Sequence, residues 1–137
     1  MTGVSMEQYQ NLEEAKVYFE GDRFAVENGM EIMELDDGKA VCGLDITEHH
    51  SNANGGVMGG AIFTLGDFAF AVLANKRHLP TVAQQVSICY LSQPKGTKLL
   101  ATARCKKDGH ITCVYNVDIT DDTGHDVAQF VATGHKL

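Results

Sequence analysis

The sequence predicts an α+β domain in which an antiparallel β-sheet wraps around one long central helix. Three observations support this fold class. Residues 60–75 have apolar or small side chains on every side of a helical wheel, so they should form a helix that is surrounded by protein. Two short strand-like runs precede this helix, and four more follow it. When a sheet with one apolar face packs on an apolar helix, both apolar surfaces are buried in one shared core.

Length and composition favour a single domain that covers residues 1–137. The chain has 137 residues, of which 44% are apolar, and this is enough for a sizeable core. No internal repeat and no low-complexity linker marks a second domain. The net charge of -7 argues against a general affinity for nucleic acid.

The same features predict a cytoplasmic protein without a membrane segment. The N-terminus carries acidic residues where a secretory signal needs a basic start and an apolar run. The longest apolar run is interrupted by Thr64, Gly66 and Asp67. The four cysteines show no CxxC spacing, so we expect reduced thiols.

Residues 1–29 should form a helical arm that covers the core. A weak helical pattern covers residues 6–19, where apolar side chains are spaced among charged ones. Asp22 is expected to be the N-cap of a further helical turn, which Gly29 ends.

Two strands should follow, at Met30–Leu35 and Ala40–Ile46. Asp37-Gly38 between them is a strong signal for a hairpin turn. Cys42 falls on the apolar face of the second strand, so it should be a core residue rather than a nucleophile.

The four later strands are expected at residues 81–91, 97–107, 110–120 and 126–134. Glycine-containing turns separate the last three, which should form an antiparallel meander. In the strand at 110–120, the apolar face consists of Ile111, Cys113, Tyr115, Val117 and Ile119. That face should pack on the central helix.

The central helix and the loop before it carry the candidate chemistry. A carboxylate such as Asp67 in an apolar helix is tolerated if something pairs with it, hydrates it or uses it, and it can act as a general base or a nucleophile. Gly59 and Gly60 leave backbone N–H groups free at the positive end of the helix dipole, where they can hold an oxyanion. The amide of Asn52 can orient a carbonyl or a water molecule.

Helix geometry limits how these groups can meet. Gly59 and Asp67 are eight residues apart, which corresponds to about 12 Å along one helix. An oxyanion donor and a nucleophile must both lie about 3 Å from the carbonyl group on which they act. If both act on one substrate, the site must join Gly59 of one subunit to Asp67 of another, and the active unit is at least a dimer.

The pattern Asn52, Gly55 and Met58-Gly59-Gly60, followed by AIFTLGDFAFAVLAN, resembles the hotdog-fold acyl-CoA thioesterases, specifically the phenylacetic-acid-degradation (PaaI-like) branch. The resemblance covers about residues 22–134, including the SICYLSQP strand end and the final meander.

The resemblance implies a homodimer with two helices side by side under a continuous sheet, usually paired again into a homotetramer. It also implies hydrolysis of acyl-CoA thioesters between subunits. Asp67 would be the base or nucleophile, the Gly59 or Gly60 N–H would polarise the thioester carbonyl, and Asn52 would place the water or the carbonyl.

Two positions depart from the family pattern. The family commonly has His-Gly-Gly where this chain has Met58 before its two glycines, and it often has Ser or Thr where this chain has Ala83. Gln84, Gln85 and Ser87 are the candidates to replace that hydroxyl, and the sequence does not show which of them faces the site. The predicted substrate-binding residues are His50, Gly55, Met58 and Gln85, and His50 is also expected to support the loop.

No metal site is predicted, because the histidines and cysteines do not stand at metal-ligand spacing. Coenzyme A enters as part of the substrate, and no cofactor is expected. The alternative is a non-catalytic hotdog protein that binds acyl-CoA as a sensor or a sequestering module, which Met58 and Ala83 make credible. A hotdog-type hydratase is a third alternative, but it requires a His paired with Asp, and Met58 removes the natural candidate.

Overall fold

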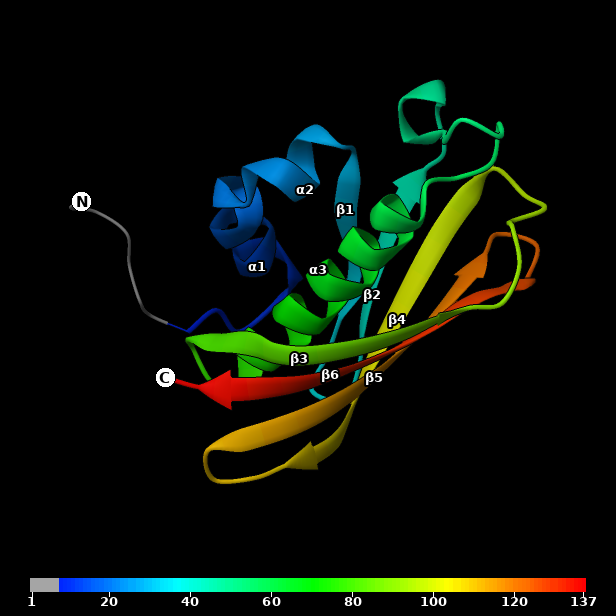
Figure 1. Cartoon of the computed structure of the whole chain (residues 1–137). Coiled ribbons are helices and arrows are strands. Elements are labelled where there is room, and N and C mark those ends of the chain that lie inside the picture. Colours follow the sequence, from blue (N-terminus) through cyan, green and yellow to red (C-terminus); the bar gives the residue numbers. More distant parts are fainter. Residues whose placement is uncertain (1–7) are drawn as a thin grey trace.

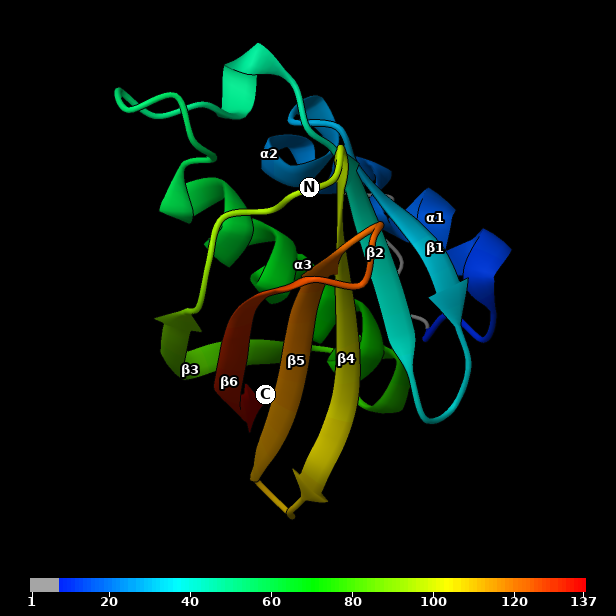
Figure 2. The ribbon, with the colours of Figure 1, turned by 90° about the vertical axis from the view of Figure 1, so that its right-hand side faces the viewer.

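Six antiparallel strands form one sheet with a long helix across it, so the predicted α+β hotdog fold is confirmed. The computed structural model describes residues 8–137. The strand order is β1-β2-β4-β5-β6-β3, and Figure 2 shows the strands side by side in this order. β1 and β3 are therefore the two edge strands.

The structure gives the following bounds. The helical elements are α1 (Leu12–Tyr18), the 3-10 turn η1 (Phe19–Gly21), α2 (Arg23–Glu27), the 3-10 turn η2 (Glu48–His50) and α3 (Gly59–Arg77). The strands are β1 (Met30–Leu35), β2 (Ala40–Asp45), β3 (Thr81–Tyr90), β4 (Lys98–Asp108), β5 (Thr112–Asp121) and β6 (Asp126–Lys136). Each predicted strand is present, with ends that differ by no more than two residues.

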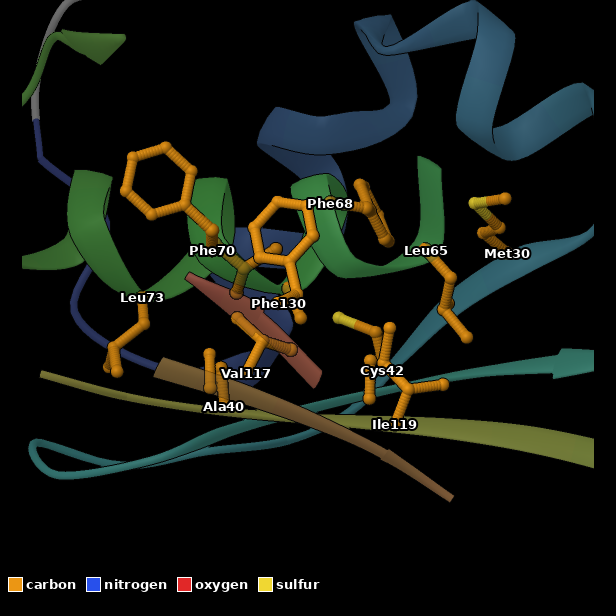
Figure 3. Packing of buried hydrophobic residues seen from close by; sticks show 14 of the residues in the cluster. Met30, Ala40, Cys42, Leu65, Phe68, Phe70, Leu73, Val117, Ile119 and Phe130 are labelled. Atoms are coloured by element: carbon orange, nitrogen blue, oxygen red, sulfur yellow. The ribbon is translucent and has the colours of Figure 1, made fainter. Parts of the chain in front are cut away.

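The core lies between α3 and the sheet, where Phe70, Leu73 and Phe130 meet residues of β2 and β5 (Figure 3). Helix and sheet approach closely at Gly66, because a Cβ atom there would lie 2.8 Å from the ring of Phe130. Cys42 is fully buried in this core, as predicted, and its burial raises the pKa of its thiol. A raised thiol pKa keeps the nucleophilic thiolate scarce.

The N-terminal arm covers the side of α3 opposite the sheet (Figure 1). The helix predicted over residues 6–19 is shorter, because Asn11 caps α1 by accepting a hydrogen bond from the Glu14 N–H at 2.9 Å. The predicted start of that helix at Met6 lies outside the described residues. Asp22 is the N-cap of α2, as predicted, although its side chain makes no capping hydrogen bond. The extent of a single domain over residues 1–137 stays a prediction.

One expectation about burial is wrong. Ile111 is 55% exposed, because the chain is still turning there and β5 begins only at Thr112. The other four residues of that apolar face are buried, as predicted. That protein surrounds helix α3 on every side stays a prediction, since within one chain Gly60 is exposed and Thr64 and Asp67 are half-buried along one stripe. Among residues 8–137, no helix is both long and apolar enough to cross a membrane.

Candidate active site

The loop before α3 is folded around the side chain of Asn52. Its Oδ1 accepts hydrogen bonds from the N–H groups of Asn54 at 2.9 Å and Gly56 at 3.1 Å. Gly55 between them has a φ of +83°, which L side chains rarely adopt. The oxygen of Asn52 thus shapes the loop, whereas its Nδ2 has no hydrogen-bond partner within residues 8–137 and remains free for a ligand.

His50 supports the other end of this loop from within the protein. It is 5% exposed, and its Nδ1 accepts the Thr47 N–H at 3.0 Å. Since Nδ1 is the acceptor, Nε2 carries the proton and donates to the Asn28 carbonyl at 2.9 Å. Both ring nitrogens are occupied by backbone groups, so His50 supports the loop as expected, while its contact with substrate stays a prediction.

The first turn of α3 exposes the predicted oxyanion donors. Met58 is the N-cap residue, 50% exposed and without a capping side-chain hydrogen bond. Within residues 8–137, no protein acceptor takes the N–H of Gly59 or Gly60. These two donors therefore project from the N-terminal end of the helix, where partial positive charge accumulates.

A cavity of about 350 Å³ opens beside these donors. It is lined by Asn52, Val57, Gly59, Ile62, Tyr90, Leu91, Ser92 and Gln93. Two of the predicted site residues, Asn52 and Gly59, thus share a cavity with the segment that follows β3. Its wall is partly apolar and partly formed by hydroxyl and amide groups, a combination that is typical of small-molecule sites.

Tyr90 and Gln93 join the loop to the end of β3, and the sequence singled out neither. The Gln93 side chain accepts the Val57 N–H at 2.8 Å and donates to the Val57 carbonyl at 3.3 Å. The Tyr90 hydroxyl donates to the Gly59 carbonyl at 3.0 Å. A Cβ atom on Gly59 would lie 3.2 Å from the Tyr90 ring. Close packing against β3 is therefore one reason for glycine at this position.

The connection after Gln93 is held by the buried carboxylate of Asp121. It accepts hydrogen bonds from the backbone N–H groups of Lys95, Gly96, Thr123 and His125, and from the Thr123 hydroxyl. Burial alone would raise the pKa of Asp121, but these hydrogen bonds outweigh it and hold the pKa well below its usual range. The carboxylate therefore stays ionised and fixes the turn that directly follows the cavity wall.

Asp67 lies on the same continuous helix as Gly59 and does not line the cavity. Its carboxylate is half-buried and has no hydrogen-bond partner within residues 8–137. Burial raises its pKa, and the negative charge of Asp22 raises it further. Because the helix is unbroken, Gly59 and Asp67 of one chain remain about 12 Å apart along the axis.

Gln85 lies away from the cavity. A β-bulge between Ala83 and Gln85 shifts the register, and Gln85 pairs with Thr133 rather than with the buried Ala132. Cross-strand partners share a face, so the exposed side chain of Gln85 lies on the outer face of the sheet. Its contact with substrate stays a prediction, as do those of Gly55 and Met58.

Residues 54–128 match the thioesterase superfamily. The chain belongs to the thioesterase superfamily. The match covers the start of α3, Asp67 and the cavity wall at the end of β3.

Three similar proteins illustrate the comparison. The chain is 32% identical to the acyl-coenzyme A thioesterase PaaI of Escherichia coli K12, over 90% of this chain and 89% of that protein. The solved structure of E. coli PaaI superimposes with a TM-score of 0.85 over 90% of each chain. Human acyl-coenzyme A thioesterase 13 is 35% identical over 72% of this chain and 73% of its own. A hypothetical thioesterase of Streptococcus pneumoniae, solved with coenzyme A, is 30% identical with a TM-score of 0.78 over 85% of this chain and 94% of that one.

Proposed function

We propose that this thioesterase-superfamily protein hydrolyses acyl-CoA thioesters to a free acid and coenzyme A. One observation carries the proposal: the N–H groups of Gly59 and Gly60, which have no protein acceptor within residues 8–137, begin a helix beside a cavity. The same helix carries a half-buried carboxylate, Asp67, whose pKa is raised by burial and then by Asp22. The relatives named acyl-coenzyme A thioesterases support the choice of substrate.

In the proposed reaction, the thioester oxygen accepts the N–H of Gly59 or Gly60. As a base, Asp67 removes a proton from a water molecule, and the resulting hydroxide attacks the carbonyl carbon. As a nucleophile, the Asp67 carboxylate attacks that carbon itself and forms an acyl-Asp67 anhydride as the thiolate leaves; a water molecule then hydrolyses the anhydride, releasing the free acid and restoring the carboxylate. In either route the C–S bond breaks and coenzyme A leaves as the thiol, with the proton taken from water. The Nδ2 of Asn52 orients the carbonyl or the water. No metal ion or cofactor takes part.

We place each site between two subunits. The axial separation of Gly59 and Asp67 in one chain is too large for both to reach one carbonyl. The stripe of α3 that includes Gly60 and Asp67 is uncovered in the single chain, and so is most of the edge strand β3. An exposed edge of this length is suited to pairing with a second copy. We therefore propose a homodimer, paired again into a homotetramer, in the cytoplasm.

Release of free thiol from a panel of acyl-CoA thioesters tests the proposal. Asp67→Asn should lower kcat by at least about 100-fold, because general base catalysis contributes this much or more. Asn52→Ala should lower the rate less. Asp118→Asn is the matched control, since it removes an exposed carboxylate from the outer face of β5. Undiminished turnover in Asp67→Asn would reject the assignment.

The alternative function is a non-catalytic sensor or sequestering protein for acyl-CoA. The exposed Met58 at the N-cap favours it, because an imidazole is absent at the position where the family commonly has one. Binding of acyl-CoA by the wild type without any thiol release would establish this alternative.

A further inference from the structure

The Tyr90 side chain contacts the first turn of α3, which carries the proposed oxyanion donors. Its hydroxyl donates to the Gly59 carbonyl at 3.0 Å, across 31 residues of sequence. The side chain is 50% exposed and lines the cavity, so this hydrogen bond lies at the site rather than in the core.

The carbonyl of Gly59 and the N–H of Gly60 belong to the same planar peptide group. A donor on the Gly59 oxygen therefore fixes the direction of the Gly60 N–H. Within α3 this oxygen is also placed to accept the helical hydrogen bond from the residue four positions later, so Tyr90 supplies a second donor to it. Hydrogen bonds in such a chain polarise one another, and the Gly60 N–H becomes a stronger donor.

Anchoring of the loop does not by itself explain this hydroxyl. Gln93 already holds the loop through both polar atoms of its amide, at Val57. The Tyr90 ring packs on Gly59, where a Cβ atom would come within 3.2 Å. Phenylalanine would provide the same packing, so the hydroxyl serves the peptide group that it touches.

We propose that Tyr90 is a positioning residue for thioester hydrolysis, which aims and polarises the Gly59-Gly60 peptide group toward the thioester oxygen. This inference rests on the proposed function, and it adds a residue from β3 to the site.

Tyr90→Phe is the test variant, because it keeps the ring and removes only the hydroxyl. It should lower kcat about 10-fold with KM nearly unchanged, less than the 100-fold or more that follows loss of an oxyanion donor itself. Tyr9→Phe is the matched control. The Tyr9 hydroxyl also donates to a carbonyl of α3, that of Val72, but more than three turns away from Gly60. Unchanged kcat in Tyr90→Phe, or an equal loss in Tyr9→Phe, would overturn the proposal.

A spectroscopic measurement separates this proposal from the proposed function. Acetyl-CoA labelled with ¹³C at the carbonyl is bound to Asp67→Asn, and the infrared carbonyl frequency is compared with and without Tyr90→Phe. Loss of the hydroxyl should return the frequency toward its value in solution, and Tyr9→Phe should leave it unchanged.

If the wild type releases no thiol from any thioester, the proposed function fails. The frequency then still decides whether Tyr90 aims and polarises the Gly59-Gly60 peptide group toward the oxygen of a bound thioester. A frequency that Tyr90→Phe leaves unchanged overturns that role, and one that it returns toward the solution value supports it.

Discussion

Asp67 on α3 lies within electrostatic range of Asp22 at the N-cap of α2, so the charge of Asp22 affects the ionisation of Asp67. Burial raises the pKa of Asp67, and the negative charge of Asp22 raises it further. The arm therefore does more than cover α3, because it brings a charge to the candidate base.

Replacement of Asp22 by Asn should shift the acid limb of the pH profile. Asp67 acts as a base or nucleophile only when ionised, so kcat/KM should fall as the pH drops through the raised pKa of Asp67. Asp22→Asn removes a like charge, which lowers that pKa and moves the limb to lower pH. Asparagine is also a good N-cap, so α2 should persist. Asp118→Asn provides the comparison, and an acid limb that stays in place would show that Asp22 does not influence the base.

Asp67→Asn should also make the protein more stable at neutral pH. The folded state raises the pKa of Asp67, so ionisation opposes folding. This cost is absent below the usual pKa of the carboxyl and develops as the pH rises toward and past the folded-state value. A neutral amide avoids it, so we expect the free energy of unfolding at pH 7 to increase.

Thermal or urea unfolding at pH 7 and at mildly acidic pH measures this gain. The difference between the two proteins should shrink as the pH falls. A variant that is less stable than the wild type at pH 7 would mean that the carboxylate has a partner in the assembled protein.

The fold was predictable because its signals are local in the sequence. The hairpin at Asp37-Gly38 joins β1 and β2, and the alternation in β5 identifies its buried face from Cys113 onward. Ile111 breaks that rule, because alternation in the sequence does not show where a turn ends. The β-bulge beside Gln85 is invisible for a similar reason: one extra residue in β3 changes which side chains share a face.

The candidate site was predictable where it follows the chain. Asn52, Gly59, Gly60 and Asp67 lie in or next to one helix, so loop chemistry and helix geometry identify them. Tyr90 and Gln93 reach the loop from 31 and 36 residues away. These contacts form because the end of β3 lies beside the start of α3, and no local sequence pattern predicts that arrangement.

Gln93→Ala should loosen the loop that carries Asn52. Both hydrogen bonds to Val57 are lost, and because the side chain is exposed, water compensates part of the loss. We expect a destabilisation of about 1 kcal/mol and a fall in kcat/KM of roughly 10-fold, because small displacements of positioned groups lower rates strongly. Gln129→Ala removes an exposed amide from β6 and should change neither quantity. Wild-type kinetics in Gln93→Ala would show that the loop needs no support from β3.

Mixed oligomers test whether a site is shared between subunits. Asp67→Asn removes the carboxylate, and Gly60→Pro removes an N–H that has no protein acceptor within residues 8–137. Proline is tolerated in the first turn of a helix, and a Cβ atom on Gly60 would have its nearest neighbour at 3.7 Å. Each variant alone should be nearly inactive. When the two are co-expressed, half of the dimers are mixed, and each mixed dimer contains one site with both the carboxylate and the N–H group. Thiol release should therefore recover to about a quarter of the wild-type rate. If both groups acted within one chain, no site in the mixture would be complete, and the rate would not exceed the sum of the two variants.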